Sequence, residues 1–350
     1  MLSPFATNAS LFRFIRAAQA APSIHNTQPW SFWIRSDDRL ELRANWKRHL
    51  PFIDPRAREL TISCGAALFN LRMAIRVAGY EHRVWLIPDE RNDPELLASV
   101  EIVADRSRRP TATEQRLYDM IPRRHTNREP FRGPRVPMNV IAELEHAARR
   151  EHAFVRLLHR HETRALLQAT AKADRELATD PAYVNELRQW TGDGMRGYGV
   201  PTPAFGPLPT KPLPGRAPVP IRDLGLGRFG ERRVERFEKR TRLLLLSTEN
   251  DRPLDWLRAG QALQRVLLTA TCRGAAASFL TQPFEINDRQ RAPVRQPSAG
   301  FMRAHLVIRL GYARPVAGAP RAVCPDVVDC RVQPPRLLRP AASAAQPVPS

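Results

Sequence analysis

The chain has 350 residues, of which 43% are hydrophobic, so it is long enough for one large domain or two ordinary ones with a real core. No run reaches the roughly 18 consecutive apolar residues of a membrane span, and residues 1–10 lack the pattern of a secretory signal, so we expect a cytoplasmic protein that does not bind membranes. The formal net charge of +20 comes mostly from arginines spread along the chain without a recognition motif, so we expect no nucleic-acid partner.

The first half of the chain alternates helical and strand patterns. Its longest helical pattern stops at Gly79, a residue type that commonly ends helices. Apolar periodicity and turn residues predict, in chain order, a helix over 8–20, a hairpin of strands 30–34 and 40–44, a helix over 61–78, and strands 84–87 and 97–103.

The second half repeats this plan. The same signals predict a helix over 137–150, a strand over 154–158, a helix over 161–177, a strand over 242–247 and a helix over 257–273. When Gly65 is placed on Gly260, four further pairs align without a gap: Ala67 with Ala262, Leu68 with Leu263, Gly79 with Gly274, and Pro88 with Pro283. A repeated helix, glycine, strand and proline favours an internal duplication over a chance coincidence of small residues.

The predicted organisation has three parts. Residues 1–120 form a first half, and residues 121–330 form a second half that contains a Gly- and Pro-rich insertion at about 190–230. So long a stretch without periodicity predicts either a lid over a site or a mobile linker. Residues 331–350, rich in Ala, Pro and Ser, predict a disordered tail.

Two polar segments are candidates for a binding site. Ser23, His25, Asn26 and Gln28 offer hydroxyl, imidazole and amide groups that suit the polar edge of a planar heterocycle, although the segment also fits an ordinary turn. In the second segment, residues 123–128, Arg124, Thr126 and Arg128 alternate and point to one side of an extended chain. Two guanidinium groups beside a hydroxyl suit a phosphate dianion, and a solvated basic surface is the alternative.

The four cysteines form no Cys-x-x-Cys pair and no cluster with histidines at zinc spacing, so we expect no metal site.

Both polar segments resemble motifs of the nitroreductase family of FMN flavoproteins. Residues 22–30, Pro-Ser-Ile-His-Asn-Thr-Gln-Pro-Trp, resemble the family's Pro-Ser-x-x-Asn-x-Gln-Pro-Trp loop, and Arg124-His125-Thr126-Asn127-Arg128 resembles its Arg-x-Ser-x-Arg phosphate motif. The match looks closest to the Acg-like branch, in which two nitroreductase-like halves lie in one chain. The resemblance implies an α+β fold, a mixed sheet covered by helices, duplicated so that one chain imitates a family dimer.

The resemblance also implies the cofactor and its site. The expected FMN-binding residues are Pro22, Ser23, His25, Asn26, Gln28, Arg124, Thr126, Arg128, Leu280, Thr281, Gln282 and Arg314. Residues 278–283 would supply the backbone near the flavin N5, and residues 311–314 the final strand with a basic residue near the phosphate. Each half lacks one of the two motifs, so we expect one complete site, one incomplete site and one FMN per chain, in a monomer that imitates a dimer or in a homodimer.

The implied activity is transfer of hydride from NADH or NADPH through FMN to a small acceptor such as a nitroaromatic compound or a quinone. The flavin carries the redox chemistry, so the sequence nominates no catalytic side chain. His25 either alters the redox properties of the flavin or forms a hydrogen bond with the loop backbone. The alternative function is a flavin-sequestering or storage protein in which a lid closes over the FMN.

Overall fold

A computed structural model describes residues 8–103, 109–194, 197–210, 219, 221–240, 242–290 and 302–329. The predicted tail at residues 331–350 lies outside these ranges.

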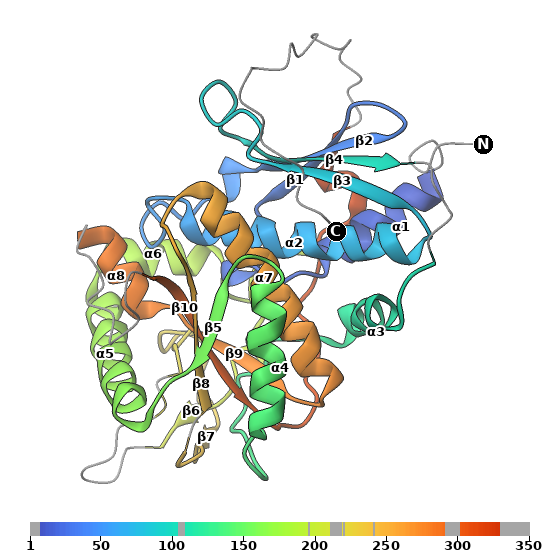
Figure 1. Cartoon of the computed structure of the whole chain (residues 1–350). Helices are drawn as coiled ribbons and strands as arrows, with labels where there is room; N and C mark the ends of the chain where they lie inside the picture. Colours follow the sequence, from blue (N-terminus) through green and yellow to red (C-terminus); the bar gives the residue numbers. More distant parts are fainter. Residues whose placement is uncertain are drawn as a thin grey trace.

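The first half folds into a helical layer under one sheet (Figure 1). Its elements are α1 (Asn8–Gln19), β1 (Trp30–Ile34), β2 (Arg39–Ala44), α2 (Arg58–Val77), β3 (Glu81–Leu86), β4 (Leu96–Val103) and α3 (Ala112–Met120), with short 3-10 turns at Ile24–Asn26, Trp46–Arg48 and Ile121–Arg123. Gly79 has a φ of 87°, which explains why the helical pattern stops there.

The second half contains α4 (Met138–Arg149), β5 (Phe154–Leu157), β8 (Arg242–Thr248), α7 (Pro253–Cys272), β9 (Ala276–Leu280), α8 (Gln282–Gln290) and β10 (Arg303–Gly311). Residues 158–241, which we call the inserted segment, separate β5 from β8. They form α5 (Arg160–Thr179), α6 (Pro181–Gln189), a 3-10 turn at Thr202–Ala204, β6 (Leu208–Pro209) and β7 (Val234–Glu235). The last described elements are a turn at Cys324–Val327 and β11 (Val328–Asp329).

The two halves share one strand order. The first sheet runs β11-β1-β2-β4-β3 and the second runs β5-β8-β10-β9. Without β11, both are four-stranded and antiparallel, and corresponding strands occupy corresponding places. The offset of 195 residues that aligns Gly65 with Gly260 also carries the bounds of α2, 58 and 77, onto those of α7, 253 and 272. This agreement supports the predicted duplication.

The two long helices cross at the pair of glycines that the alignment matches. A Cβ atom on Gly65 would lie 2.2 Å from the Leu257 carbonyl oxygen, and one on Gly260 would lie 2.0 Å from that of Ile62. Only glycine lets two helix backbones approach this closely. Matched residues therefore meet at the junction of the halves, as a local two-fold arrangement requires.

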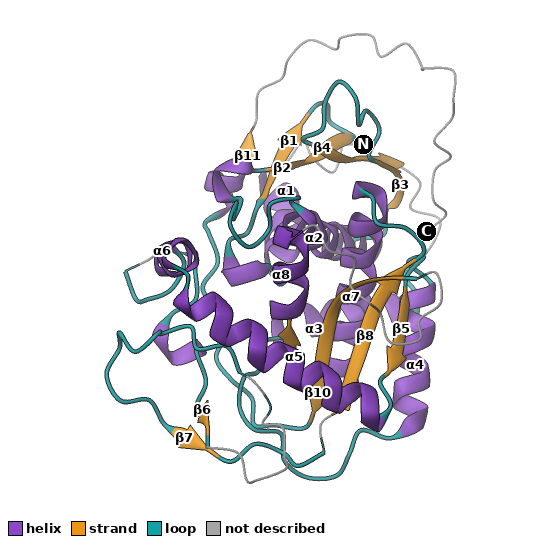
Figure 2. Ribbon diagram, turned by 90° about the vertical axis from the view of Figure 1, so that its left-hand side faces the viewer, coloured by secondary structure: helices purple, strands orange, loops and turns teal. Residues whose placement is uncertain are grey.

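The apolar faces of the helices determine how the helices and sheets pack into layers. In the first half α1 and α2 pack against the sheet through Phe14, Ile15 and Leu68, all buried. In the second half α4 and α7 cover one face of the sheet, and α5 and α8 cover the other, as Figure 2 shows. By length and composition α2 could cross a membrane, but 94% of its apolar window is buried inside the protein, which is typical of a core helix.

The α+β class is confirmed, and the predicted helices and strands lie close to their expected bounds. Two details differ. The sheet is split in two, and only the first is mixed, because β11 runs parallel to β1. The strand expected to include residues 311–314 ends at Gly311, so Arg314 follows it in a loop.

Candidate functional site

Residues 22–28, which we call the amide loop, have an unusual backbone. His25, Asn26 and Gln28 have φ values of 44°, 55° and 50°. Positive φ values are unfavourable in free energy for residues other than glycine, and such residues are common at functional sites. The Ser23 hydroxyl accepts a hydrogen bond from the Gln28 N–H at 2.9 Å and so holds the loop, while Pro22 is buried. The loop therefore presents its side chains in fixed directions.

Asn26 joins the amide loop to two distant segments. Its side-chain N–H groups donate to the carbonyl oxygens of Gly199, in the inserted segment, at 2.8 Å and of Pro320 at 2.9 Å. Its Oδ1 accepts from Arg321 Nη1 at 2.9 Å. Pro320 and Arg321 belong to residues 315–323, which we call the C-terminal strap.

Gln28 makes the same connections. Its amide nitrogen donates to the Gly197 carbonyl at 2.7 Å, and its amide oxygen accepts from the Ala322 N–H at 3.1 Å. Arg48 donates to the Gln28 carbonyl at 2.8 Å, bonds the Tyr198 hydroxyl and lies over the Tyr198 ring. The inserted segment and the C-terminal strap are thus both fastened to the amide loop.

Arg124, which is buried, and Arg321, which is half-buried, form a pair of cations beside this loop. Both donate to the Ala20 carbonyl, at 3.2 and 3.3 Å, and Arg321 also donates to that of Ala21 at 3.2 Å. Burial and the neighbouring Arg321 lower the pKa of Arg124 to about 9, and burial lowers that of Arg321 to about 10. Neither guanidinium has a carboxylate partner in the part of the chain that the structure describes, so this positive charge is uncompensated.

The rest of the basic segment, residues 123–128, follows the edge of the second sheet. Thr126 forms a parallel bridge with Ala277 of β9. Arg128 donates to the Ala204 carbonyl of the inserted segment at 2.8 Å, and Gly206 packs against its backbone. Burial, with Arg222 and Arg232, lowers the pKa of Arg128 to about 10. The cations near Arg128 thus differ from those near Arg124. The basic segment therefore contributes to two positive clusters: the first is Arg124 with Arg321, and the second is Arg128 with Arg222 and Arg232.

His25 lies at the second of these clusters. Burial, Arg222 and Arg128 hold the pKa of the imidazole well below its usual value, so the ring is neutral at physiological pH. Its Nε2 is buried and has no hydrogen-bond partner among the described residues. An unpaired buried ring nitrogen between two guanidinium groups fits a polar ligand at this position.

The segment after β9 completes the second cluster. Leu280 is buried at the end of the strand, and the Thr281 N–H donates to the Gln282 side chain at 3.1 Å. The Thr281 hydroxyl accepts from Arg222 Nη2 at 3.3 Å, and the same nitrogen contacts Glu285 at 2.5 Å. Three of the predicted residues therefore lie together here, beside an arginine from the inserted segment.

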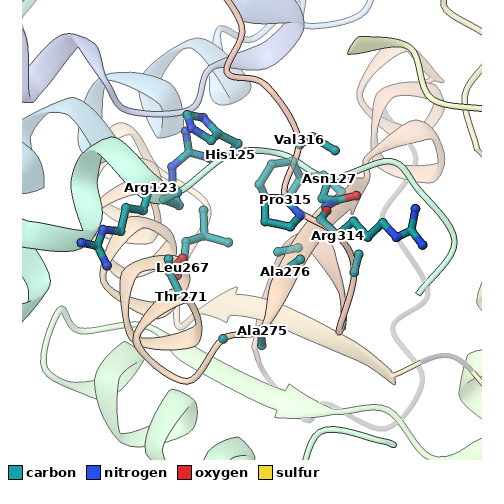
Figure 3. Close-up of a pocket in the computed structure, with 15 residues that line it drawn as sticks. Arg123, His125, Asn127, Leu267, Thr271, Ala275, Ala276, Arg314, Pro315 and Val316 are labelled. Atoms are coloured by element: carbon teal, nitrogen blue, oxygen red, sulfur yellow. Dashed lines mark hydrogen bonds between the residues drawn. The ribbon is translucent and has the colours of Figure 1, made fainter. Parts of the chain in front are cut away.

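Arg314 occupies a different environment. Its side chain is exposed, and its carbonyl accepts from the Asn127 amide at 2.8 Å. It lines a cavity of about 170 Å³ with Arg124 and Asn127, and in Figure 3 its side chain extends away from Arg123 and His125. The cavity therefore adjoins the first cluster, and the arginine that lies beside Arg124 there is Arg321.

The corresponding place in the second half is filled differently. Between α4 and β5, Glu151 is buried and pairs with Arg72 at 2.6 Å and Arg265 at 2.8 Å. These two cations share one carboxylate, whereas Arg124 and Arg321 have none among the described residues.

Sequence reasoning missed Arg321 and Arg222. Both lie in segments without periodicity, and arginine is so abundant in this chain that composition does not single them out. Only the fold brings them to the amide loop. The basic residue expected after the last strand of the second half was the one available signal for Arg321.

The sequence matches no protein-family model. It is 33% identical over 327 residues to a Mycobacterium tuberculosis protein named "Putative NAD(P)H nitroreductase", with 92% of this chain and 91% of the relative covered. A second protein of that organism, "Putative NAD(P)H nitroreductase acg", is 31% identical over 329 residues, with 91% and 95% covered.

Solved structures show weaker similarity. A nitroreductase from Anabaena variabilis gives a TM-score of 0.43 at 12% identity, covering 84% of this chain and 82% of its own. NfnB from Mycobacterium smegmatis, an FMN-dependent nitroreductase in complex with NADPH, gives 0.36 at 14% identity, covering 62% and 98%. These scores are too low to carry an argument, so the assignment depends on the sequence relatives. Identities above 30% over nine-tenths of both chains show common descent, and the chain therefore belongs to the nitroreductase family, in the Acg-like branch.

Proposed function

We propose that the protein is an FMN-binding oxidoreductase that passes hydride from NADH or NADPH to a small acceptor such as a nitroaromatic compound or a quinone. With a quinone the overall reaction is NAD(P)H + H⁺ + quinone → NAD(P)⁺ + hydroquinone, which balances two electrons and two protons. FMN supplies the electron carrier, and the protein supplies binding and electrostatics. The names of the relatives support this proposal.

The observation that carries the proposal is the uncompensated charge of Arg124 and Arg321. Two adjacent guanidinium groups, one buried and one half-buried, without a carboxylate partner in the described ranges fit a phosphate dianion, which accepts charge-assisted hydrogen bonds. At the other end, the unpaired Nε2 of His25 and the Thr281 hydroxyl that bonds Arg222 fit the polar edge of a flavin ring. The residues present therefore fit FMN.

Arg124, Thr126 and Arg321 would hold the phosphate. Arg128, His25 and residues 280–282 would face the ring, and the inserted segment would exclude water. Arg314 would add positive charge at the rim of the cavity beside the phosphate. No side chain here is assigned a proton-transfer role.

The visible spectrum of the purified protein tests the proposal. The protein should show a flavin band or acquire one with added FMN, and anaerobic NADPH should bleach it. A colourless protein that takes up no FMN would refute the proposal.

A flavin-sequestering protein is the second candidate, and the fastening of Asn26 and Gln28 to the covering segments favours it. In that case FMN binds but the band persists under anaerobic NADPH and NADH, because neither reductant reaches the ring. Dithionite, a smaller reductant, serves as the control that the bound flavin can be reduced.

A further inference from the structure

Arg222 has no counterpart in the first half. There β1 and β2 are joined by residues 35–38, whereas the second half places the whole inserted segment between β5 and β8. Arg222 belongs to that segment, yet its side chain is only 9% exposed and lies at the second positive cluster rather than on the surface. The inserted segment therefore contributes a charged group to the site as well as covering it.

The guanidinium of Arg222 is held by three elements. It donates to the Tyr183 hydroxyl of α6 at 3.3 Å, to the Thr281 hydroxyl after β9 at 3.3 Å and to the Glu285 carboxylate of α8 at 2.5 Å. Although burial alone would lower it, Glu285 and Tyr183 raise the pKa of Arg222, so the group stays protonated. A cation fixed this firmly requires no reorganisation when charge develops beside it.

The charges around Arg222 do not cancel. The positive charges of Arg222 and Arg128 both lower the pKa of His25, whose ring is neutral. Glu285 pairs with Arg222 and Asp223 pairs with Arg232, whereas Arg128 has no carboxylate partner among the described residues. Asp174 accepts a hydrogen bond from Gln282, and burial raises its pKa. The unpaired guanidinium of Arg128 therefore acts together with Arg222 on His25, whose Nε2 is itself unpaired among the described residues.

A phosphate group needs only one positive cluster, and Arg124 and Arg321 already provide one. Arg321 lowers the pKa of Arg124, whereas Arg222 and Arg232 lower that of Arg128, so the two clusters are made of different arginines. A hydride brings two electrons and one proton, so its acceptor gains one negative charge. The second cluster is suited to that charge.

We propose that Arg222 is a positioning residue that stabilises the negative charge gained by the bound flavin on reduction. Glu285 holds the guanidinium in place and moderates its field. This inference rests on the proposed function, because it requires FMN in the site. It makes the inserted segment a determinant of the reduction potential.

The test is the midpoint potential of FMN bound to the full chain, measured by spectroelectrochemical titration. Arg222→Gln should weaken binding of the reduced cofactor relative to the oxidised one by about tenfold, which lowers the potential by about 30 mV for a two-electron couple. Glu285→Gln should raise the potential, because it leaves the cation without its counter-charge. Arg222→Lys should stay near the wild-type value, because it keeps the charge.

The two glutamine variants should shift the midpoint potential in opposite directions. A purely structural role would not do this, since simple loosening of the site would shift the potential of both variants in the same direction. The matched control is Arg43→Gln, whose partners Glu41 and Trp33 lie on the first sheet and whose partner Asp93 lies in the connection before β4. It should leave the potential unchanged.

An unchanged potential in Arg222→Gln, or shifts of equal sign in the two glutamine variants, overturns the inference while FMN binding by the wild type still supports the proposed function. If Arg222→Gln fails to fold, Glu285→Gln decides alone, and a potential that does not rise overturns the inference. Failure of the wild-type protein to bind FMN refutes both.

Discussion

At the scale of single residues, the site is defined by two cations without a carboxylate partner and by one neutral imidazole with an unpaired nitrogen, all judged among the described residues. A buried guanidinium or imidazole without a hydrogen-bonded counter-group is costly, and proteins retain such groups mainly where a ligand satisfies them. Arg124, Arg321 and His25 are three such groups around one loop. Their convergence could not be read from the sequence, because His25 and Arg321 are almost 300 positions apart.

Arg321→Ala tests the first positive cluster. The substitution removes charge-assisted hydrogen bonds, so FMN affinity should fall by about 2 kcal/mol, or about thirtyfold in Kd. Quenching of flavin fluorescence measures the Kd. Arg314→Ala is the matched control, because that side chain is exposed, and its loss should be much smaller. Equal losses would contradict the assignment of Arg321.

His82→Leu tests the effect of a buried neutral histidine on stability. Burial, Arg72 and Arg76 lower the pKa of His82 to about 3, and neither ring nitrogen has a partner among the described residues. Below the unfolded pKa of about 6.5 the unfolded chain binds a proton that the folded chain does not, so stability falls with decreasing pH by about 1.4 kcal/mol per unit.

The leucine variant should lose this contribution. Urea unfolding at several pH values between about 4 and 6 should give a shallower slope than wild type by about 1.4 kcal/mol per pH unit. Parallel slopes in the two proteins would show that His82 titrates normally in the fold.

At the scale of elements, most helices and strands follow from periodicity, and the connections between them do not. The helices over 8–20, 61–78, 137–150 and 257–273 were predictable because each has a wide apolar face and a recognisable end. Helices α3, α6 and α8 were not predicted, since each is only nine residues long and depends on packing against longer helices: α3 against α2 and α7, and α6 and α8 against α5. The same holds for β11, whose two residues form a strand only because β1 offers a free edge.

Gly65→Ala tests the crossing of α2 and α7. In an ordinary helix this change stabilises by about 1 kcal/mol. Here the new Cβ would lie 2.2 Å from a backbone oxygen, so the helices must separate, and we expect a net loss of about 2 kcal/mol or more in unfolding free energy.

Thermal and urea unfolding measure the difference. Gly194→Ala is the control, because nothing lies within 4 Å of the added atom, and it should change stability little. A stabilised Gly65→Ala variant would mean that the two helices are not in contact at this position.

At the scale of the whole molecule, the two halves share a topology but not a chemistry. The first half supplies the amide loop, and the second supplies the basic segment and the C-terminal strap. The motifs themselves were visible in the sequence, and the structure brings the Arg124 side chain to the Ala20 carbonyl, next to the amide loop. The sequence could not show that Arg124 and Arg128 belong to two different positive clusters. Their alternation along an extended segment predicts that both side chains point to one side, but it does not predict which residues each of them contacts there.

The asymmetry predicts one FMN per chain. At the position corresponding to the amide loop, the second half carries Glu151, whose carboxylate pairs with both neighbouring arginines, so a second phosphate would have to displace existing ion pairs. Flavin released by denaturation and quantified against protein should give a ratio near one at saturation. A ratio near two would show that the second place also binds cofactor.

The shared strand order has an evolutionary consequence. In a symmetric assembly of identical subunits every substitution appears at both related positions, so an addition that helps one site is imposed on the other. Joining two such units in one polypeptide removes that constraint, and each copy can then diverge alone. A long addition beside one site, with the corresponding place closed by an ion cluster, is an outcome that a dimer of identical chains could not reach by mutation of a single gene.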